Sequence, residues 1–424
     1  MKRILNNCVL ILLTVLIGAC AASKKLDKTI STALNPETFG NHFSGIMIYD
    51  PISGDTVYQD NSEKYFTPAS NTKIFTLYTS LLLLAKDIPV IKYCNVNDTL
   101  FLEGTGNPSL LHPFLKDSSV IRFLKGYKNI SINLNNFTDT RFGPGWAWED
   151  YDGYYAAERS GLPIFGNVVT IYKTDSLQVI PGYFRSNVSL LKNTRNRKID
   201  SNSFYYDPAI KDTLEIPFKT DSLVIQGLLE AAIGREISLV SKMPCKEKKI
   251  LSGINTDSIN KRMMQESDNF LAEQLLLTAS STLSDTLNTQ IAIEYMLKTH
   301  LKELKQSPRW VDGSGLSRYN LFSPESMVYV LNAMYKEIPK ERLFNLFAQG
   351  GESGTIANWY PGNPQPYIYA KTGSLGNNHN ISGYLITKSE KTLIFSFMNN
   401  HFKNSVSEIK KQMQSVFEWL RDNY

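Results

Sequence analysis

Histidine and cysteine are both scarce in this sequence, which has five histidines and four cysteines among 424 residues. Zinc and other transition metals in proteins are usually held by His, Cys and acidic side chains with short spacings. The sequence contains no H-E-x-x-H motif and no comparable cluster. We therefore expect no metal ion and no other cofactor.

An excess of one charge is also missing, because 45 Lys and Arg residues face 40 Asp and Glu residues, for a net charge of +5. Nucleic-acid-binding domains usually carry a basic patch or stripe. The basic clusters at 192–198 and 245–249 are short, and we interpret both as solvated faces. We therefore expect no nucleic-acid partner. An apolar content of 42% indicates a globular protein, neither disordered nor spanning a membrane several times.

The apolar run at the N-terminus, residues 9–17, is too short to cross a bilayer as a stable helix. It follows two basic residues and precedes Gly-Ala and then Cys20, so residues 1–20 have the pattern of a bacterial lipoprotein signal peptide. An ordinary secretory signal with an incidental cysteine is the alternative, and both predict export. We expect a periplasmic protein anchored to a bacterial membrane by lipid on Cys20, with residues 21–35 as a polar tether.

Two cysteines remain once Cys8, in the signal, and Cys20 are set aside. An exported compartment permits a disulfide bond between Cys94 and Cys245. The sequence by itself leaves open whether these two residues meet.

Hydrophobic periodicity predicts an α+β fold in which an antiparallel sheet is covered by helices. We expect one domain to combine residues 36–91 with 238–424. Short β-like runs dominate residues 92–237, which we interpret as a β-rich insertion of one or two domains. The predicted strands are 42–50, 56–60, 366–375, 380–389 and 391–400, and the predicted helices are 67–86, 268–283, 325–338 and 405–424.

Ser70 and Lys73 in the stretch TPASNTK form an S-x-x-K pair at the start of the helix predicted after Pro68. A serine hydroxyl becomes a good nucleophile when a base removes its proton. Residues three apart lie on one face of a helix, so Lys73 can reach Ser70. An ammonium group is no base, so Lys73 must be buried or close to another cation, and activity should fall on acidification. Spacing alone is equally compatible with an ordinary helix start.

The tripeptide Ser267-Asp268-Asn269 precedes a predicted helix. In an extended stretch Ser267 and Asn269 point the same way, and both could face one cleft while Asp268 faces the protein. A helix N-cap is the simpler alternative, because all three residue types cap helices well.

The tripeptide Lys371-Thr372-Gly373 occurs once, at the end of a predicted strand, and Ser374 follows it. A cation and a hydroxyl at the edge of a sheet suit the binding of a carboxylate, and glycine allows a backbone to approach closely. The alternative is an ordinary strand with an exposed lysine.

S-x-x-K, S-D-N and K-T-G in this order are the signature of penicillin-binding proteins and class A β-lactamases. The stretches LFLEGTGNPSL, GPGWAWEDYDGYYAA, SDNFLAEQLL, DGSGLSRYN and AKTGSL resemble the D-alanyl-D-alanine carboxypeptidases of the low-molecular-mass class C penicillin-binding proteins. That family has a large insertion between the first two motifs, which matches residues 92–237. Asn107 is a departure, since the family commonly has Asp there.

The resemblance implies a penicillin-binding, β-lactamase-like domain that hydrolyses peptidoglycan stem peptides through an acyl-serine. It implies Ser70 as the nucleophile and Lys73 as its base. Ser267, Asn269 and Lys371 would complete the catalytic set, with Ser267 passing a proton to the leaving D-alanine. Thr372, Gly373 and Ser374 would bind the terminal carboxylate and the oxyanion, and β-lactam antibiotics would acylate the same serine.

Three alternatives stay open at this point. The same serine could also cleave cross-links as an endopeptidase. The fold could instead serve a β-lactamase or esterase, or a non-catalytic wall-binding module.

The acidic loop with Asp150 and Asp152 could meet an ammonium group of the stem peptide, although a turn packed by Trp146 and Trp148 explains it as well.

Overall fold

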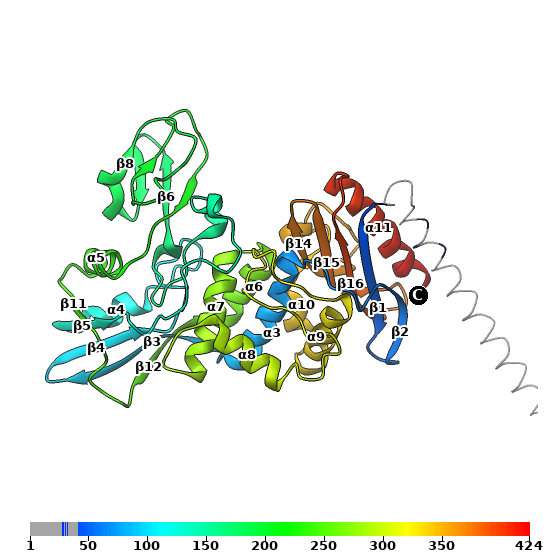
Figure 1. The fold of residues 1–424 in the computed structure, drawn as a ribbon, viewed down its shortest axis with the longest axis horizontal. Coiled ribbons are helices and arrows are strands. Elements are labelled where there is room, and N and C mark those ends of the chain that lie inside the picture. The colour runs from blue at the N-terminus through cyan, green and yellow to red at the C-terminus, as the bar shows by residue number, and fades with distance from the viewer. Residues whose placement is uncertain (1–27, 29, 31, 33–40) are drawn as a thin grey trace, which may run out of the picture. The chain divides into compact units, whose positions relative to one another are not determined.

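The computed structural model describes residues 28, 30, 32 and 41–424 (Figure 1). The predicted signal peptide, Cys20 as the predicted lipidation site, and nearly all of the predicted tether lie outside these residues. Within the described part of the chain, no helix is long and apolar enough to cross a membrane. The same residues contain no group of three or more His, Cys, Asp or Glu side chains that could hold a metal ion.

The chain folds into two compact units, and each is described by itself. Unit 1 contains the described residues up to Asn71, Leu304–Pro308 and Leu321–Tyr424, while unit 2 contains Thr72–Glu303 and Arg309–Asn320. The domain limits expected from the sequence, with an insertion over 92–237, stay a prediction.

Unit 1 is built on a six-stranded sheet in which every neighbouring pair is antiparallel, in the order β13-β14-β15-β16-β1-β2 (Figure 1). Nearly every side chain of β15 and β16 is buried, because helices cover both faces of the sheet. The strands are β1 Phe43–Asp50, β2 Asp55–Asp60, β13 Ala348–Gln349, β14 Ile368–Leu375, β15 Asn378–Ile386 and β16 Thr392–Asn400.

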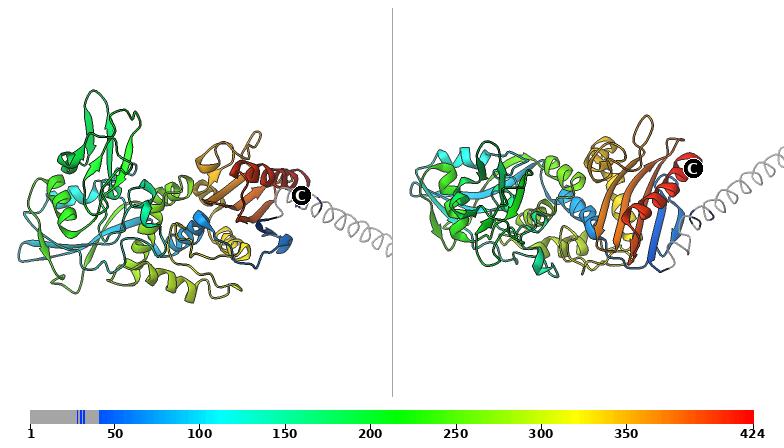
Figure 2. Two further views of the ribbon diagram at one scale, coloured as in Figure 1. Left: turned by 45° about the horizontal axis from the view of Figure 1, so that its top comes forward. Right: turned by 90° about the horizontal axis from the view of Figure 1, so that it is seen from above.

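Two helices of unit 1 lie on opposite faces of this sheet (Figure 2). The C-terminal helix α11, Val406–Asn423, packs Phe417 and its other apolar residues against Phe395 and Phe397 of β16. Helix α9, Pro324–Glu337, lies on the other face, where the Tyr384 hydroxyl of β15 donates to the Leu331 carbonyl at 2.8 Å. The remaining elements of unit 1 are α10 Lys340–Leu346 and the 3₁₀ turn η6 Gly354–Ile356.

Unit 2 contains a mixed five-stranded sheet in the order β11-β5-β4-β3-β12, with two smaller sheets, β10-β6-β7 and β8-β9. β4, β5 and β11 run parallel, whereas β3 is antiparallel to both of its neighbours. The strands are β3 Asp87–Val96, β4 Thr99–Gly104, β5 Asn129–Asn133, β6 Val168–Lys173, β7 Leu177–Ile180, β8 Val188–Ser189, β9 Phe204–Tyr205, β10 Leu214–Pro217, β11 Ser238–Val240 and β12 Lys249–Asn255.

The helices of unit 2 include a group in which α7 contacts α3, α6 and α8. Helix α7 is buried from Phe270 to Ser281, and most of its residues are apolar or small, although Glu273 and Gln274 are buried with them. The helices are α3 Lys73–Leu83, α4 Ser119–Lys125, α5 Ser222–Ile233, α6 Thr256–Gln265, α7 Asn269–Leu283 and α8 Thr289–Thr299, with 3₁₀ turns η2 Trp148–Asp150, η3 Tyr154–Ala156, η4 Phe165–Asn167 and η5 Gly182–Asn187.

Most of the expected elements are confirmed, namely the α+β class, the N-terminal hairpin, the three C-terminal strands and the closing helix. The helix expected from Pro68 is different. Ser70 lies in a 3₁₀ turn, η1 Ala69–Thr72, and the α-helix begins only at Lys73. Ala69 has φ 48°, which an α-helix does not allow, so the helical hydrogen bonds cannot extend back to Pro68.

Cys94 and Cys245 form a disulfide bond, which answers the question that the sequence left open. Their Cα atoms are 6.7 Å apart although 151 residues separate them in the chain. The bond links Cys94 on β3 to Cys245 in the segment before β12. β3 and β12 are neighbouring strands at one side of the five-stranded sheet. The disulfide therefore joins the two ends of the long chain segment between these strands.

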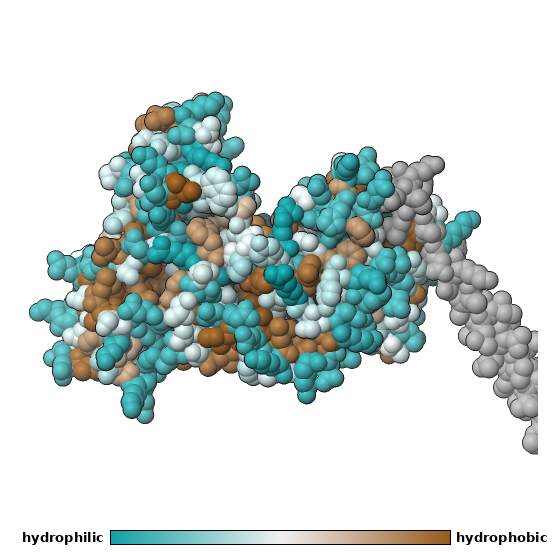
Figure 3. All heavy atoms as spheres, viewed as in Figure 1, coloured by the Kyte–Doolittle hydropathy of each residue, from teal (hydrophilic) through white to brown (hydrophobic). Residues whose placement is uncertain are grey.

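The surface of unit 2 carries apolar side chains over the region of the five-stranded sheet and α5, shown in brown in Figure 3. Leu223 of α5 is 70% exposed and Ile250 of β12 is 57% exposed. Single exposed apolar residues are common on soluble domains. We assign no function to them.

Candidate active site

The turn that carries Ser70 is held by side chains of the unit 1 sheet. The Thr67 N–H donates to Asn400 Oδ1 at 2.7 Å, and the Thr67 carbonyl accepts from Asn380 Nδ2 at 3.0 Å. Ala69 sits in the left-handed region, which costs a non-glycine residue about 1–3 kcal/mol. Such a conformation persists because surrounding contacts fix it. The sheet therefore places the backbone of Ser70.

Gly373 is packed directly against this turn. A Cβ atom built on Gly373 would lie 2.4 Å from the Pro68 carbonyl oxygen and 2.8 Å from the Ser70 amide nitrogen. Both neighbours are backbone atoms and cannot rotate away. Position 373 must therefore be glycine for strand β14 and the Ser70 turn to lie this close. Unit 1 thus brings together the first and the third of the motifs recognised in the sequence.

Lys371 and Thr372 precede this glycine on β14. The pairing of β13 with β14 covers Tyr369 and Ala370, so both residues lie beyond it. The side chain of Lys371 is fully buried, and its Nζ donates to the Thr372 carbonyl at 2.7 Å. The Thr372 hydroxyl is 2.7 Å from that of Thr355. The alternative of an exposed lysine on an ordinary strand is therefore wrong.

Ser374 is exposed, and its hydroxyl is 2.7 Å from Nδ1 of the buried His379 on β15. Burial lowers the pKa of His379 to about 3, and the nearby Lys410 and Lys371 lower it further. The imidazole is therefore neutral at ordinary pH. This hydrogen bond ties the end of β14, where the amide of Ser374 lies, to the next strand.

Lys73 is fully buried in unit 2 and makes two short hydrogen bonds. Its Nζ donates to Asn269 Oδ1 at 2.7 Å and to the Ser314 carbonyl at 2.7 Å. Burial lowers the pKa of Lys73 to about 8, while the carboxylates of Asp312, Glu273 and Asp268 oppose the lowering. A lysine with this pKa is partly neutral near neutral pH, as a general base requires.

The S-D-N tripeptide forms the helix cap that the sequence allowed, and its asparagine also contacts Lys73. Asp268 is the N-cap of α7 and accepts from the Leu271 amide at 3.1 Å. Ser267 has φ 62°, so the chain turns sharply just before the helix. Asn269 points one amide atom at Lys73 and donates with the other to the Tyr155 carbonyl at 3.0 Å. The second motif is therefore both a helix cap and the partner of Lys73.

Two residues of the Lys73 environment were not singled out from the sequence. Ser314 lies in the stretch DGSGLSRYN, whose resemblance to the family was noted without a role for any residue. Glu273 is a charged residue in the apolar run FLAEQLLL, and it is 1% exposed. A carboxylate within a run of mostly apolar residues is costly to bury unless it is paired, and this was the available signal.

Both carboxylates of the acidic loop have hydrogen-bond partners within unit 2. Asp150 accepts from the Tyr155 hydroxyl at 2.8 Å, and the buried Asp152 accepts from the Asn196 amide at 2.6 Å. Trp146 donates to another part of unit 2, but Trp148 is 74% exposed and does not pack the turn. The expected packing is therefore wrong for Trp148, and the contact of Trp146 is to Asp312, not to the acidic turn.

A model of the D-Ala-D-Ala carboxypeptidase 3 (S13) family matches residues 26–247 and 256–421. Penicillin-sensitive carboxypeptidase A of Dictyostelium discoideum is 24% identical to the chain over 458 residues, which covers 88% of the chain and 85% of the relative. D-alanyl-D-alanine carboxypeptidase DacB of Haemophilus influenzae is 30% identical over 178 residues, covering 39% of the chain and 36% of that protein.

Solved structures resemble the whole chain at low sequence identity. Penicillin binding protein 4 (dacB) from Haemophilus influenzae has a TM-score of 0.72 at 19% identity, with 93% of this chain and 99% of that chain covered. A predatory endopeptidase from Bdellovibrio bacteriovorus, in complex with an immunity protein, has a TM-score of 0.50 at 15% identity and covers 89% and 92%. The first likeness confirms the expected fold of a penicillin-binding protein.

Proposed function

The chain belongs to the D-Ala-D-Ala carboxypeptidase 3 (S13) family, and from that premise we propose how its own residues carry out the reaction. It is a serine-type D-Ala-D-Ala carboxypeptidase and a penicillin-binding protein. We propose peptidoglycan stem peptides as its substrates and Ser70 as the nucleophile. The observation that carries this proposal is the buried Lys73, whose lowered pKa suits a base three residues from that serine.

In the first step Ser70 Oγ attacks the carbonyl carbon between the two terminal D-alanines, and its proton passes to neutral Lys73. Lys73 is the first residue of α3 and directly follows the 3₁₀ turn that carries Ser70, so only two residues separate the nucleophile from its base. The backbone N–H groups of Ser70 and Ser374 stabilise the oxyanion. Lys371 and Thr372 bind the terminal carboxylate.

In the second step the C–N bond breaks. Ser267 donates its hydroxyl proton to the amine of the leaving D-alanine and takes up the proton that Lys73 received from Ser70, while Lys371 tunes that transfer. Asn269 keeps Lys73 oriented through the hydrogen bond between them. Water then cleaves the Ser70 ester, and the serine regains its proton. A β-lactam antibiotic acylates Ser70 as in the first step. Its amine stays attached to the acyl group and does not depart, so the acyl-enzyme persists.

We expect the protein to release D-alanine from a pentapeptide stem and to lose that activity after treatment with penicillin. Product analysis by mass spectrometry on free pentapeptides and on cross-linked dimers measures both reactions. Cleavage of the dimers alone would assign an endopeptidase. Turnover of the β-lactam without peptide cleavage would assign the rival β-lactamase, and no acylation at all would leave a wall-binding module.

The rate of acylation should fall on acidification. Below the Lys73 pKa of about 8 the neutral fraction decreases about tenfold per pH unit, so the rate constant should drop about tenfold between pH 7 and pH 6. Stopped-flow measurement with a β-lactam that does not titrate in this range gives the profile, and circular dichroism confirms folding at each pH. A rate that stays level from pH 6 to pH 9 contradicts Lys73 as the base.

We also propose that the protein is exported and lipid-anchored through Cys20. The disulfide between Cys94 and Cys245 supports export, because such bonds persist in oxidising compartments. We expect Cys20→Ser to abolish the mass increment of lipid and to release the protein from membranes in cell fractionation. Cys8→Ser, inside the predicted signal, is the matched control and should remain anchored. Membrane retention of the Cys20→Ser protein contradicts the anchor.

A further inference from the structure

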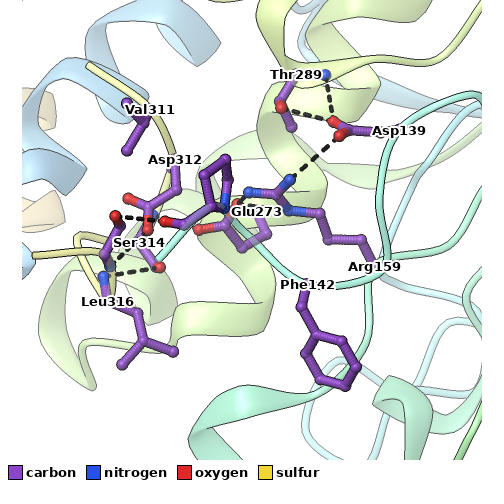
Figure 4. A network of polar contacts seen from close by, with 12 residues as sticks. Asp139, Phe142, Arg159, Glu273, Thr289, Val311, Asp312, Ser314 and Leu316 are labelled. Atoms are coloured by element: carbon purple, nitrogen blue, oxygen red, sulfur yellow. Dashed lines mark hydrogen bonds and ion pairs between the residues drawn. The ribbon is translucent and has the colours of Figure 1, made fainter. Parts of the chain in front are cut away.

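Glu273 and Arg159 form a buried ion pair in unit 2 (Figure 4). Glu273 of α7 accepts with Oε2 from Nε and Nη2 of Arg159, at 2.9 Å and 2.6 Å. Each of the two side chains is 1% exposed. The other carboxylate oxygen, Oε1, accepts from the backbone N–H of Ser314 at 2.7 Å. Glu273 therefore connects a fixed cation to the residue whose carbonyl holds Lys73.

A second carboxylate, that of Asp139, holds the guanidinium group of Arg159 (Figure 4). Arg159 Nη1 lies 3.4 Å from Asp139 Oδ1, and Asp139 Oδ2 accepts from the amide and the hydroxyl of Thr289 at 2.8 Å and 2.6 Å. The guanidinium group thus has a carboxylate at each end, and its planar fork allows little rotation. The Glu273 carboxylate is restricted as well, because Oε2 accepts two N–H groups of this guanidinium while Oε1 accepts the Ser314 N–H.

Asp312 supplies a carboxylate that holds the peptide group between Ser314 and Gly315. The Gly315 N–H donates to Asp312 Oδ1 at 2.8 Å, and the carbonyl of the same peptide group, that of Ser314, accepts from Lys73. Asp312 Oδ2 is occupied by the Ser317 amide at 2.7 Å and by Trp146 Nε1 at 2.9 Å. Glu273 and Asp312 therefore hold successive N–H groups of one loop, which aims the carbonyl between them.

We propose that Glu273, held by Arg159, is a positioning residue for Lys73: it fixes the Ser314 segment so that its carbonyl and Asn269 hold Nζ in place. This inference rests on the proposed role of Lys73 as the base. It adds a buried glutamate and arginine that lie outside the three motifs.

Glu273 also contributes to the charge that surrounds Lys73. The charges that act on Lys73 are the carboxylates of Asp312, of Glu273 and of Asp268, the N-cap of α7. Helix α6, which contacts α3, carries Arg262, paired with Asp268 at 3.3 Å, and also Asp257 and Lys261. The three carboxylates favour the ammonium form. Removal of the charge on Glu273 should therefore let Lys73 lose its proton at lower pH. A residue that only supports folding has no reason to shift this titration.

The first test is Glu273→Gln, measured as the pH profile of acylation by a fluorescent penicillin. Glutamine has one acceptor oxygen, so it can accept from Arg159 or from Ser314 but not from both. We expect the plateau rate above pH 8 to fall about 10–100-fold, the usual effect of losing a residue that orients a functional group from outside the site. We expect the acid limb of the profile to move to lower pH.

Glu273→Gln also leaves Arg159 as an unpaired buried cation, which can destabilise the fold. The double variant Glu273→Gln with Arg159→Met removes both charges and avoids this problem. If the pair is structural only, the double variant should regain both thermal stability and acylation. Positioning predicts that stability returns while acylation stays slow and the acid limb stays shifted.

The matched control is Glu158→Gln, which removes another buried carboxylate of unit 2. Glu158 Oε2 accepts from the Thr220 amide and hydroxyl at 2.7 Å and 2.8 Å, and Glu158 is not among the charges that act on Lys73. We expect a lower melting temperature with an unshifted acid limb. An unchanged rate and profile in folded Glu273→Gln overturns the inference. A wild-type protein without acylation, or with a level pH profile, overturns the proposed function instead.

Discussion

Ser70→Ala should fold normally, bind no fluorescent penicillin covalently and release no D-alanine. The hydroxyl that the variant lacks is the proposed site of the acyl bond, and alanine offers no atom that could take its place. Loss of an enzyme's nucleophile typically lowers turnover by several orders of magnitude, so we expect a fall of at least about 10⁴-fold. Gel labelling and product analysis measure the two activities, and thermal unfolding checks the fold.

The sequence offers a matched control for this variant. Ser407 and Lys410 have the same S-x-x-K spacing, but they lie on the C-terminal helix α11 and Ser407 is exposed. Ser407→Ala should retain full labelling and full activity. A covalent band that persists in Ser70→Ala would place the nucleophile elsewhere and would require the acylated residue to be mapped by peptide mass spectrometry.

The second large effect is expected for Gly373→Ala. The added Cβ would lie 2.4 Å from the Pro68 carbonyl oxygen, closer than any real contact, so strand β14 or the Ser70 turn must move. A displacement of about 1 Å at a reacting group can cost about 10²-fold in rate. We therefore expect acylation to fall at least about 10²-fold, although every proposed catalytic side chain is still present.

Gly182→Ala separates this effect from the general cost of replacing glycine. A Cβ on Gly182 has no atom within 4 Å, and its φ is not in the left-handed region. This control should acylate at the wild-type rate. The melting temperature of Gly373→Ala should drop as well, since the close packing lies inside unit 1. Wild-type kinetics in Gly373→Ala would contradict the role assigned to this contact.

Short motifs in the sequence were enough to predict the family correctly. Each tripeptide contains the residue types that an acyl-serine enzyme needs, and the motif order identified the family before any contact was known. The structure brings Gly373 against the Ser70 turn and Asn269 against Lys73. The catalytic and binding roles of all the motif residues stay predictions.

The start of the first helix could not be predicted in the same way. The apolar run after Lys73 indicated a buried helix correctly. The preceding residues, Ala69 to Thr72, form a 3₁₀ turn because Thr67 is held by two asparagines of the sheet more than 300 residues away. Local helix propensity cannot register such a tertiary constraint.

The sequence by itself determined the α+β class, the hairpin and the C-terminal strands, and the identities of the motif residues. These features depend on periodicity and on neighbours within a few positions, and a linear sequence records both. Only the tertiary structure decided what surrounds Lys73, because Asn269 and Ser314 lie 196 and 241 positions away. It also decided that Cys94 meets Cys245 and that Glu273 is paired with Arg159. Burial and hydrogen bonding are properties of the folded chain, and they set the pKa of the lysine that the motif only names.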